Sequence, residues 1–532
     1  MPPTPANRPD RDESPVRDRG DACPGALRLH TADDGALARV RVPAGLLDAR
    51  QAYALADAAE RLGDGALDIT SRGNLQLRGL DPVCAGELAE LLDAAGLLPA
   101  PAHERIRNVV ASPLSGLDGR GHLDVRPLVR ELDTLLCAGA RATALSGRFL
   151  FALDDGRGDM AELAADVMLL AEAGDGAPGA PVTGGAGAPG GPGAPGRPRV
   201  RVVAGEARVR VRPEDAARML LLAAEAFLDA ADASGARPWR VRELPREHAL
   251  STRDLLRRAA AADLPAEPAP EPPAAPEGTG PAEPPAPEPP APGAHARDGA
   301  DAAVCAGVVL GRMSAAQVRS LARVAERHGT GELRVTPWRS VVLPGVAAAH
   351  LPELAAAGLV TGAGSPWHGV SACTGRPGCG KALADVRADA TALAAAGAGG
   401  TPVHWSGCGR RCGHPHGAHV DLVATGEGRY TLAVVPANRP AAAAVPATEA
   451  ATEAVPEAPP GALPGAVPEA VPEASPGAAP AKVNATETAT ATAPGTGADH
   501  PVRHDLDVPE LAGALAAARG GRPLHHRPAT TK

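Results

Sequence analysis

The sequence predicts an α+β protein that carries two copies of one folding unit, separated by segments that do not fold. A shift of 266 positions places residues 45–80 over residues 311–346 without a gap, and 14 of the 36 aligned positions are identical. Glycine and proline contribute 62 and 57 of the 532 residues and gather in a few stretches. Aromatic residues make up only 2%, so the core is expected to consist of alanine, leucine and valine.

Each copy begins with a helix start signal. Asp48 stands three residues before Gln51, and Ser314 stands three residues before Gln317, which is the pattern of a capping box. Apolar residues then recur with the 3.6-residue period of a helix, up to a Gly-x-Gly break. A short strand, a turn and a second strand are expected after the break.

The flanking residues complete the unit. Residues 36–43, "ALARVRVP", alternate as a half-buried strand does, and residues 83–96, "VCAGELAELLDAAG", predict a helix. The order of strand, helix, strand, strand and helix suits a ferredoxin-like half-domain. Two such halves predict an internal pseudo-twofold with a site between them, and the alternative is a pair of independent domains.

Three stretches have a composition that opposes folding. Residues 174–197, 262–298 and 438–499 are rich in proline, alanine, glycine and glutamate, and they lack an apolar period. We therefore expect the following division: a disordered N-terminus (1–22), the first half-domain (23–100), an α+β domain (101–261, with 174–197 as an insertion), a linker (262–298), the second half-domain (299–362), a cluster-binding domain (363–437), a disordered linker (438–499) and a C-terminal strand and helix (500–532).

Charge and hydropathy exclude two classes of partner. The net charge of −9 argues against binding to nucleic acid. The N-terminal residues lack the apolar core of a signal peptide, and no window reaches 18 apolar residues, so a cytoplasmic protein without membrane contact is expected.

Four cysteines are grouped with the spacing C-x5-C-x28-C-x3-C: Cys373, Cys379, Cys408 and Cys412. In a reducing compartment, such spacing indicates metal ligands rather than disulfides. Zinc knuckles commonly have two to four residues between paired cysteines, so the spacing favours an iron–sulfur cluster over the alternatives of structural zinc or chance. Residues 381–396 predict a helix with Cys379 near its N-terminus. The other four cysteines are expected to act as small apolar residues: Cys23, Cys84, Cys137 and Cys305.

These cysteines, together with the two half-domains, resemble the nitrite and sulfite reductase family, whose cysteines hold a 4Fe-4S cluster. Three further stretches resemble segments of that family: "TSRGNLQLRG" at 70–79, "IRNVVASPLSGLD" at 106–118 and "LSGRFLFALDDG" at 145–156. The resemblance implies the nitrite/sulfite reductase fold over most of the chain outside the linkers.

The residues that bind the anion in these reductases are only partly matched. The two family arginines fall on Arg72 and Arg107, but the two lysines fall on Arg148 and Leu150. Leucine can neither bind an oxyanion nor deliver a proton, and arginine stays protonated and so cannot deliver one either. The sequence therefore lacks a complete site for anion reduction.

This combination resembles a branch of the family that oxygenates a tetrapyrrole in aerobic cobalamin biosynthesis. Segments 155–167, 238–244 and 335–345 resemble the same branch. The resemblance implies a 4Fe-4S cluster, a non-haem iron, O2 and an external electron donor, either an NADH-linked reductase or a ferredoxin. The implied reaction hydroxylates precorrin-3A at C20 and closes a γ-lactone, and sirohaem is not expected. The alternatives are a sirohaem-dependent reductase and a non-catalytic metal scaffold.

Arginines suit the carboxylates of such a substrate because guanidinium groups bind carboxylates bidentately. The expected substrate-binding residues are Arg72, Arg78, Arg107, Arg148 and Arg339. Iron ligands could come from two stretches, whose candidate residues are His103, Glu104, His404, His414, His416 and His419. The sequence does not select a ligand set among them.

Overall fold

The first half-domain has a five-stranded sheet with two helices. The computed structural model describes residue 21 and residues 23–174, 198–270, 289–394, 400–415, 417–436 and 503–520. In spatial order the first sheet contains β1 (His30–Ala32), β2 (Gly35–Val40), β5 (Leu75–Leu80), β4 (Ala66–Ile69) and β14 (Arg312–Ser314). Its helices are α1 (Ala49–Leu62) and α2 (Ala85–Ala94).

The second half-domain repeats this arrangement. Its sheet contains, in spatial order, β12 (Gly293–Arg297), β13 (Ala300–Gly307), β16 (Ser340–Pro344), β15 (Glu332–Val335) and β3 (Leu46–Asp48). Its helices are α6 (Ala315–His328) and α7 (Leu351–Ala356). The predicted order of strand, helix, strand, strand and helix is confirmed in both copies.

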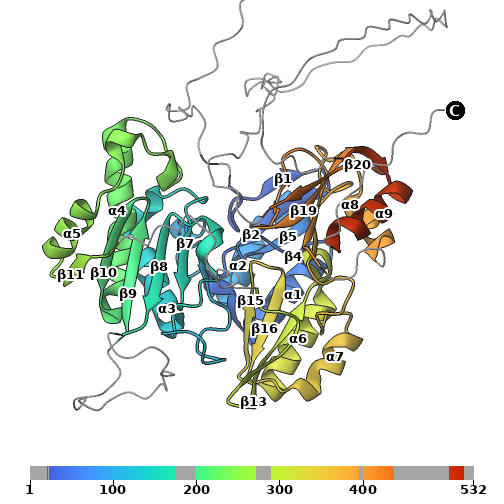
Figure 1. Cartoon of the computed structure of the whole chain (residues 1–532), viewed down its shortest axis with the longest axis horizontal. Coiled ribbons are helices and arrows are strands. Elements are labelled where there is room, and N and C mark those ends of the chain that lie inside the picture. Colours follow the sequence, from blue (N-terminus) through green and yellow to red (C-terminus); the bar gives the residue numbers. More distant parts are fainter. Residues whose placement is uncertain are drawn as a thin grey trace, which may run out of the picture. The chain divides into compact units, whose positions relative to one another are not determined.

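The two halves exchange one short strand each. In the first sheet, β14 from the second half pairs with β4, with Met313 opposite Leu67. In the second sheet, β3 from the first half pairs with β15, with Leu47 opposite Leu333. Side chains from both halves form one hydrophobic core, and α1 and α6 lie against each other (Figure 1). The expected pseudo-twofold is confirmed, and the alternative of two independent domains is wrong.

Both capping boxes form as predicted. The Asp48 carboxylate accepts a hydrogen bond from the Gln51 backbone at 2.7 Å, and the Gln51 side chain accepts one from the Asp48 backbone at 3.0 Å. Ser314 and Gln317 make the same reciprocal bonds in the second half. Each exchanged strand ends at its capping residue, so the capping box fixes where the strand turns into the helix.

A six-stranded sheet follows the first half-domain. Its strands, in spatial order, are β11 (Ala266–Pro268), β10 (Ala207–Val211), β9 (Arg199–Ala204), β8 (Val167–Glu172), β7 (Phe151–Asp154) and β6 (Val109–Ala111). Helices α3 (Arg126–Ala138), α4 (Ala216–Ser234) and α5 (Thr252–Ala261) pack on it (Figure 1). Three of the few aromatic residues, Phe149, Phe151 and Phe227, meet in its core with ring centroids 5.1–5.2 Å apart.

The last sheet contains the cysteines and the C-terminal segment. Its strands, in spatial order, are β17 (Val370–Ala372), β18 (Val403–Ser406), β19 (His419–Gly426), β20 (Arg429–Val435) and β21 (Arg503–Asp507). Helices α8 (Val386–Ala392) and α9 (Val508–Arg519) pack against this sheet. The strand and helix expected after the last linker are confirmed, and they pack here.

Two expectations about local structure are wrong. The range 262–298, expected as a linker, contains β11 at one end and β12 at the other. The helix expected over 381–396 begins only at Val386, where Asp385 caps it. Residues 175–197, 271–288 and 437–502, which include most of the three stretches expected to be unstructured, lie outside the described residues.

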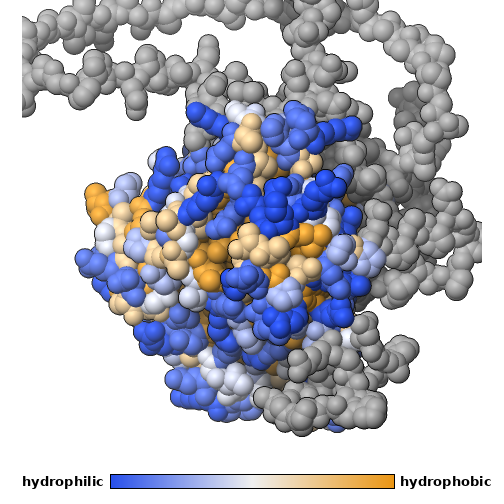
Figure 2. All heavy atoms as spheres, turned by 90° about the vertical axis from the view of Figure 1, so that its left-hand side faces the viewer, coloured by the Kyte–Doolittle hydropathy of each residue, from blue (hydrophilic) through white to orange (hydrophobic). Residues whose placement is uncertain are grey.

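The surface over the six-stranded sheet and its helices is largely polar. Figure 2 shows that hydrophilic side chains dominate this side, with apolar ones exposed in smaller areas between them. Within the described ranges, no helix has the length and apolar character needed to cross a bilayer.

Candidate functional site

A cavity of about 450 Å³ lies where the two half-domains meet the six-stranded sheet and the cysteine-bearing sheet. We call it the arginine pocket. Its polar and sulfur-bearing lining residues are Cys23, Arg39, Arg41, Asp68, Thr70, Ser71, Arg72, Asn74, Gln76, Asn108, Arg148, Arg339, Cys373, Thr374, Arg387 and Cys412.

Six arginines face this pocket, against a single carboxylate, that of Asp68. Burial and the nearby Arg240 and Arg41 lower the pKa of Arg72 to about 10. Burial lowers the pKa of Arg39 and of Arg339 to about 10 as well, and a neighbouring arginine adds to the effect in each case. Buried cations that repel one another are stabilised by a bound anion, so the arginine pocket suits a ligand with several carboxylates.

The arginines are held in place mostly by carbonyl and amide oxygens. Arg39 donates to the Gln76 side chain at 3.1 Å, Arg72 to the Gly147 carbonyl at 3.5 Å, and Arg339 to the Gly413 carbonyl at 2.5 Å. Such partners orient a guanidinium group without neutralising its charge.

Two further contacts position arginines of the pocket. The guanidinium of Arg148 lies 4.5 Å from the ring centroid of Trp239, a cation–π contact that also leaves its charge available. Arg339 packs so closely against Gly311 that a Cβ atom there would lie 2.6 Å from the Arg339 Cδ, and Gly311 also has a φ of +75°. Glycine is therefore needed at this position.

The four predicted ligand cysteines come from two loops that follow neighbouring parallel strands. Cys373 follows β17, and Cys408 follows β18 after Gly407. Cys373 and Cys412 line the arginine pocket. Burial raises the pKa of the Cys412 thiol, and the other three thiols raise it further because they lie near it.

Among the described residues, the four sulfurs are not gathered as tetrahedral zinc would require. Tetrahedral zinc with bonds of about 2.3 Å would place its four sulfurs roughly 3.8 Å apart. Among the described residues, no three of these four sulfurs lie within 4.8 Å of one another. In a 4Fe-4S cluster each thiolate binds a different iron atom, so the sulfurs lie farther apart.

Backbone groups also support a cluster at this place. The Gly407 backbone N–H donates a hydrogen bond to the Cys373 sulfur at 3.1 Å, which stabilises a thiolate. A Cβ atom at Gly407 would lie 2.6 Å from the Ala382 Cβ, so only glycine permits this approach of the two loops. These residues could therefore hold a cluster against one wall of the arginine pocket.

Two of the five predicted substrate arginines lie elsewhere. Arg78 bonds Asp34 at 2.7 and 2.8 Å and the Gly378 carbonyl at 2.6 Å, which ties the first half-domain to the cysteine loop. Arg107 forms a bidentate ion pair with Asp133, which lies on α3, and both hydrogen bonds are 2.7 Å long. Neither residue lines the arginine pocket, and each is paired with a carboxylate elsewhere, so the expectation for both is corrected.

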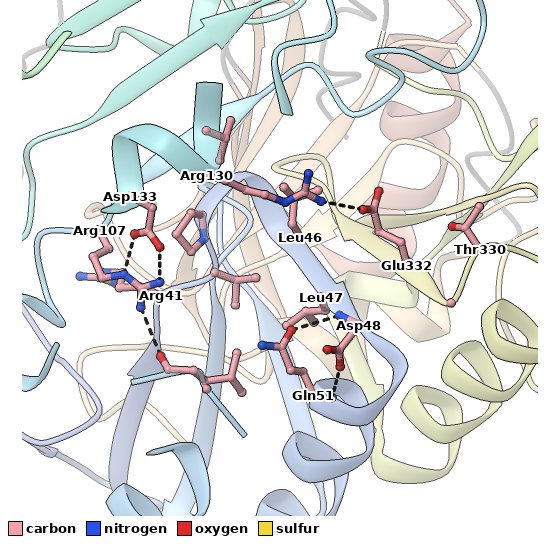
Figure 3. Close-up of a pocket in the computed structure, with 16 residues that line it drawn as sticks. Arg41, Leu46, Leu47, Asp48, Gln51, Arg107, Arg130, Asp133, Thr330 and Glu332 are labelled. Carbon is pink, nitrogen blue, oxygen red and sulfur yellow. Dashed lines mark hydrogen bonds and ion pairs between the residues drawn. The ribbon is translucent and has the colours of Figure 1, made fainter. Parts of the chain in front are cut away.

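Arg107 lines a different cavity, of about 440 Å³, near the exchanged strand β3 (Figure 3). There the pair of Arg130 with Glu332, at 3.2 Å, joins α3 to the second half-domain. The charged side chains of this cavity are largely paired with one another, so we interpret it as a structural junction. It is Asn108, the next residue after Arg107, that faces the arginine pocket.

Three arginines and one cysteine are among the residues of the arginine pocket that the sequence reasoning missed. Arg39 and Arg41 are two residues apart in "ALARVRVP", so an extended chain places both side chains on one face. This spacing was the signal from which both could have been predicted. Arg387 reaches the pocket from α8, where it also bonds Asp68 at 2.9 Å. Cys23 was expected to be a small apolar residue, but its sulfur accepts a hydrogen bond from Arg41 at 3.3 Å and it lines the pocket.

Among the described residues, the histidines near the cysteines form no group of metal ligands, although the rings of His414 and His419 stack with centroids 5.9 Å apart. His404 is fully buried between the Ser371 hydroxyl, 2.9 Å from Nδ1, and the Cys412 carbonyl, 3.1 Å from Nε2. Burial lowers its pKa well below the ordinary value, so it is a neutral ring that positions the Cys412 loop.

The other iron-ligand candidates have separate partners. His103 bonds the Gly139 carbonyl at 3.0 Å, and His419 bonds the Gly417 carbonyl at 2.8 Å. The Glu104 carboxylate accepts a hydrogen bond from the Ala26 backbone at 2.8 Å. His416 lies outside the described residues. Within the part of the chain that is described, no iron-ligand set of histidine and carboxylate groups forms in the arginine pocket.

Comparisons with known proteins agree with this architecture. The family described as "Nitrite/Sulfite reductase ferredoxin-like half domain" matches residues 30–95 and again residues 295–358. The ferredoxin–nitrite reductase of Synechococcus elongatus is 31% identical over 408 residues, which cover 73% of this chain and 76% of the relative. This chain belongs to the nitrite and sulfite reductase family.

One relative with a different named activity and one solved structure are also similar to this chain. A precorrin-3B synthase from a Sinorhizobium species is 28% identical over 432 residues, covering 78% of this chain and 83% of that protein. The solved structure of the Mycobacterium tuberculosis NirA protein superimposes with a TM-score of 0.56 at 19% identity, over 75% of this chain and 74% of that one. The duplicated half-domains are thus the fold of the family.

Proposed function

We propose that this chain is a precorrin-3B synthase, an oxygenase that hydroxylates precorrin-3A at C20 and forms the γ-lactone with the ring A acetate. One oxygen atom of O2 enters the product and the other leaves as water, with two electrons from an external donor. The observation that carries this proposal is the set of six arginines around one cavity, against a single carboxylate.

In the proposal, the arginines bind the carboxylates of the tetrapyrrole. Arg39, Arg41 and Arg72 come from the first half-domain and its turn, whereas Arg339 comes from the second. Positive charges contributed by both half-domains suit a flat ligand with acidic groups around its rim. Arg148, supported by Trp239, contributes a further cation from the segment just before β7.

The cysteines would hold the 4Fe-4S cluster, which, when bound, supplies or accepts single electrons. The ligands would be Cys373, Cys379, Cys408 and Cys412. The proposal assigns no residue to the non-haem iron, because no ligand set has formed in the pocket among the described residues.

The surroundings of Leu150 argue against reduction of an anion at this site. Leu150 is 3% exposed and packs in an apolar cluster with Val110, Met160 and Trp338, and its backbone N–H donates to Asp166 at 2.8 Å. A leucine in this setting offers neither charge nor proton to sulfite or nitrite.

The second candidate is a sirohaem-dependent nitrite reductase, which the 31% identity to the cyanobacterial enzyme favours. A pocket that accepts a tetrapyrrole substrate also suits a tetrapyrrole cofactor. The two candidates differ in whether the tetrapyrrole stays bound after purification.

The deciding experiment is an absorption spectrum with iron and sulfide analysis on anaerobically purified protein, followed by incubation with precorrin-3A, a reductant and O2. We expect a broad brown absorption without sirohaem bands, and a product heavier by one oxygen atom. Sirohaem bands accompanied by turnover of nitrite or sulfite would contradict the oxygenase and identify a reductase. A colourless protein that contains zinc would contradict both.

A further inference from the structure

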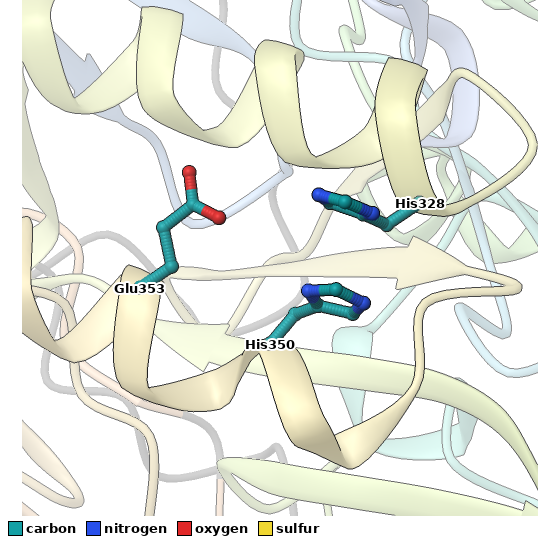
Figure 4. A group of neighbouring side chains, drawn as sticks. All are labelled: His328, His350 and Glu353. Carbon is teal, nitrogen blue, oxygen red and sulfur yellow. The ribbon is translucent and has the colours of Figure 1, made fainter.

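A group of three side chains outside the arginine pocket has the composition of a metal site. His328 is the last residue of α6, His350 ends the short helix that precedes α7, and Glu353 lies on α7. One ligand atom from each residue lies within 4.8 Å of those of the other two. Figure 4 shows the two rings one above the other, with the Glu353 carboxylate beside them. We call this group the His328 cluster.

The stacked rings have no other evident structural role. Their centroids are 3.8 Å apart with an interplanar angle of 16°. Within the described ranges, neither ring has a hydrogen-bond or ion-pair partner. His328 is exposed at the surface, and the other two members are partly exposed, so the cluster is open to an ion from solution.

The duplication provides an internal comparison. The shift of 266 positions that aligns the two halves places His328 over Leu62, His350 over Cys84 and Glu353 over Glu87. These positions occupy the same elements, since Leu62 ends α1 and Cys84 ends the short helix before α2. In the first half Leu62 and Cys84 pack against the hydrophobic core. Only the second copy therefore replaces this packing by two imidazoles beside the shared glutamate.

The equivalent glutamates, Glu87 and Glu353, form ion pairs of different length in the two halves. Glu87 contacts Arg61 at 2.5 Å, whereas Glu353 lies 3.6 Å from the Arg323 Nε, with both side chains over 40% exposed. An exposed ion pair of this length contributes little, so Glu353 can turn towards a cation at small cost.

We propose that the His328 cluster binds one divalent transition-metal ion, such as Zn2+, through two imidazole nitrogens and one carboxylate oxygen. Nitrogen and carboxylate ligands suit such an ion, and water completes the four positions. Tetrahedral zinc would bring the ligand atoms to roughly 3.3 Å apart, so they would have to approach one another by up to about 1.5 Å, which changes of side-chain rotamer can supply.

The cluster is separate from the arginine pocket. Thr330, two residues after His328, bonds the Pro344 carbonyl at the end of β16, whereas Arg339 lies in the turn that precedes β16. The two sites thus lie at opposite ends of the β15–β16 hairpin. The proposed ion would join the end of α6 to α7, and it is distinct from any iron that takes part in oxygenation.

The test is isothermal titration of the full chain with zinc chloride, after removal of loosely held metal. Three proteins are compared: the wild type, the double variant His328→Leu/His350→Ala, and His30→Ala, which removes another exposed histidine. Leucine is the residue of the first half at the position of His328. Because the cysteines are the same in all three, zinc binding at the thiols does not affect the comparison.

We expect the double variant to bind one zinc ion fewer per chain than the wild type, and His30→Ala to bind the same number. Glu353→Gln should weaken the affected site at least about tenfold. Circular dichroism of each variant establishes that it is folded. Equal stoichiometry and affinity in the wild type and the folded double variant would overturn the proposal. This outcome is independent of the oxygenase assay, because the titration needs no substrate.

Discussion

Whether an arginine in this protein is a structural or a ligand-binding residue depends on the acids near it. Arg72, Arg148 and Arg339 line the arginine pocket, whereas Arg78 and Arg107 are held by Asp34 and Asp133. Those partners lie 44 and 26 residues away in the sequence. Local motifs cannot show which distant carboxylate pairs with which guanidinium. The sequence therefore predicts that the site is rich in arginine, but it does not predict which arginines belong to it.

Arg72→Gln tests the role of the arginines of the pocket. A hydrogen bond to a charged group contributes about 1.5–3 kcal/mol, so we expect binding of a polycarboxylate tetrapyrrole to weaken about 10- to 150-fold. Equilibrium titration measures the change. Arg61→Gln, in an exposed ion pair with Glu87, is the matched control and should bind as the wild type does. Unchanged binding in Arg72→Gln would exclude this side chain from the site.

Cys373→Ser tests the proposed cluster ligands. We expect loss of the brown absorption and of bound sulfide, because serine cannot replace the thiolate that receives the Gly407 N–H. Cys84→Ser, at a partly buried position of the first half-domain outside the cysteine loops, should retain both. Retention of a full cluster in Cys373→Ser would show that this residue is not a ligand.

A buried carboxyl group gives a prediction about pH. Burial raises the pKa of Asp159 to about 7, and nearby Asp154 and Asp155 act in the same direction although Ser112 donates to it at 2.6 Å. The unfolded chain releases this proton near pH 4. The folded state thus holds more protons between about pH 4 and pH 7, so the free energy of unfolding falls as pH rises, by at most about 1.4 kcal/mol per unit.

Asp159→Asn removes this titration. Its melting temperature relative to that of the wild type should rise between pH 5 and pH 8, as measured by calorimetry at several pH values. A difference between the two proteins that does not change with pH would mean that Asp159 is ionised throughout.

Among the elements, those defined by local signals were predicted and those defined by distant contacts were not. Capping boxes need only residues three apart, so both helix starts were found. The helix expected from residue 381 failed because the backbone there has other partners: the Leu383 N–H bonds the Gly407 carbonyl, and the Ala382 N–H bonds the Cys379 carbonyl. The cysteine loops thus delay the helix until Val386. The strand exchange had no local signal at all.

Leu47→Ala tests the strand exchange. Leu47 is 4% exposed and lies in β3, opposite Leu333 of the other half. Truncation of a buried leucine costs about 2–5 kcal/mol, and a shared core spreads the loss over both half-domains. Calorimetry should show one transition for the two halves, shifted to lower temperature. Leu27→Ala, at a leucine that is 39% exposed, should shift it much less. A shift confined to one of two separate transitions would contradict the shared core.

At the scale of the whole molecule, the arginine pocket exists only because four sheets meet. The repeat in the sequence predicted two of them and a site between them, but the arginines come from segments spread from Arg39 to Arg387. Their convergence depends on the strand exchange and on pairs such as Arg78 with Asp34, which no single motif encodes. The sequence alone therefore indicated the family fold and several of the arginines, whereas the convergence of these segments on one cavity emerged only from the structure.

The topology of the last sheet indicates that the arginine pocket does not require residues 438–499. Strands β20 and β21 are antiparallel neighbours, with Leu432 opposite Arg503. The chain therefore leaves and re-enters the sheet at adjacent positions, as in a hairpin, although residues 437–502 intervene. A connection of roughly eight residues spans this gap, since two to five residues close most hairpins.

We expect replacement of residues 438–499 by about four glycine and serine residues to leave the cluster content, the melting temperature and tetrapyrrole binding unchanged. Truncation after residue 436 is the control. It also removes β21 and α9, whose Leu511 and Leu515 are at most 2% exposed, and should unfold the last sheet. Absorption, calorimetry and equilibrium titration on both proteins separate the contribution of the segment from that of the strand and helix beyond it. Loss of tetrapyrrole binding in the shortened protein, with its fold retained, would mean that the replaced residues take part in the site.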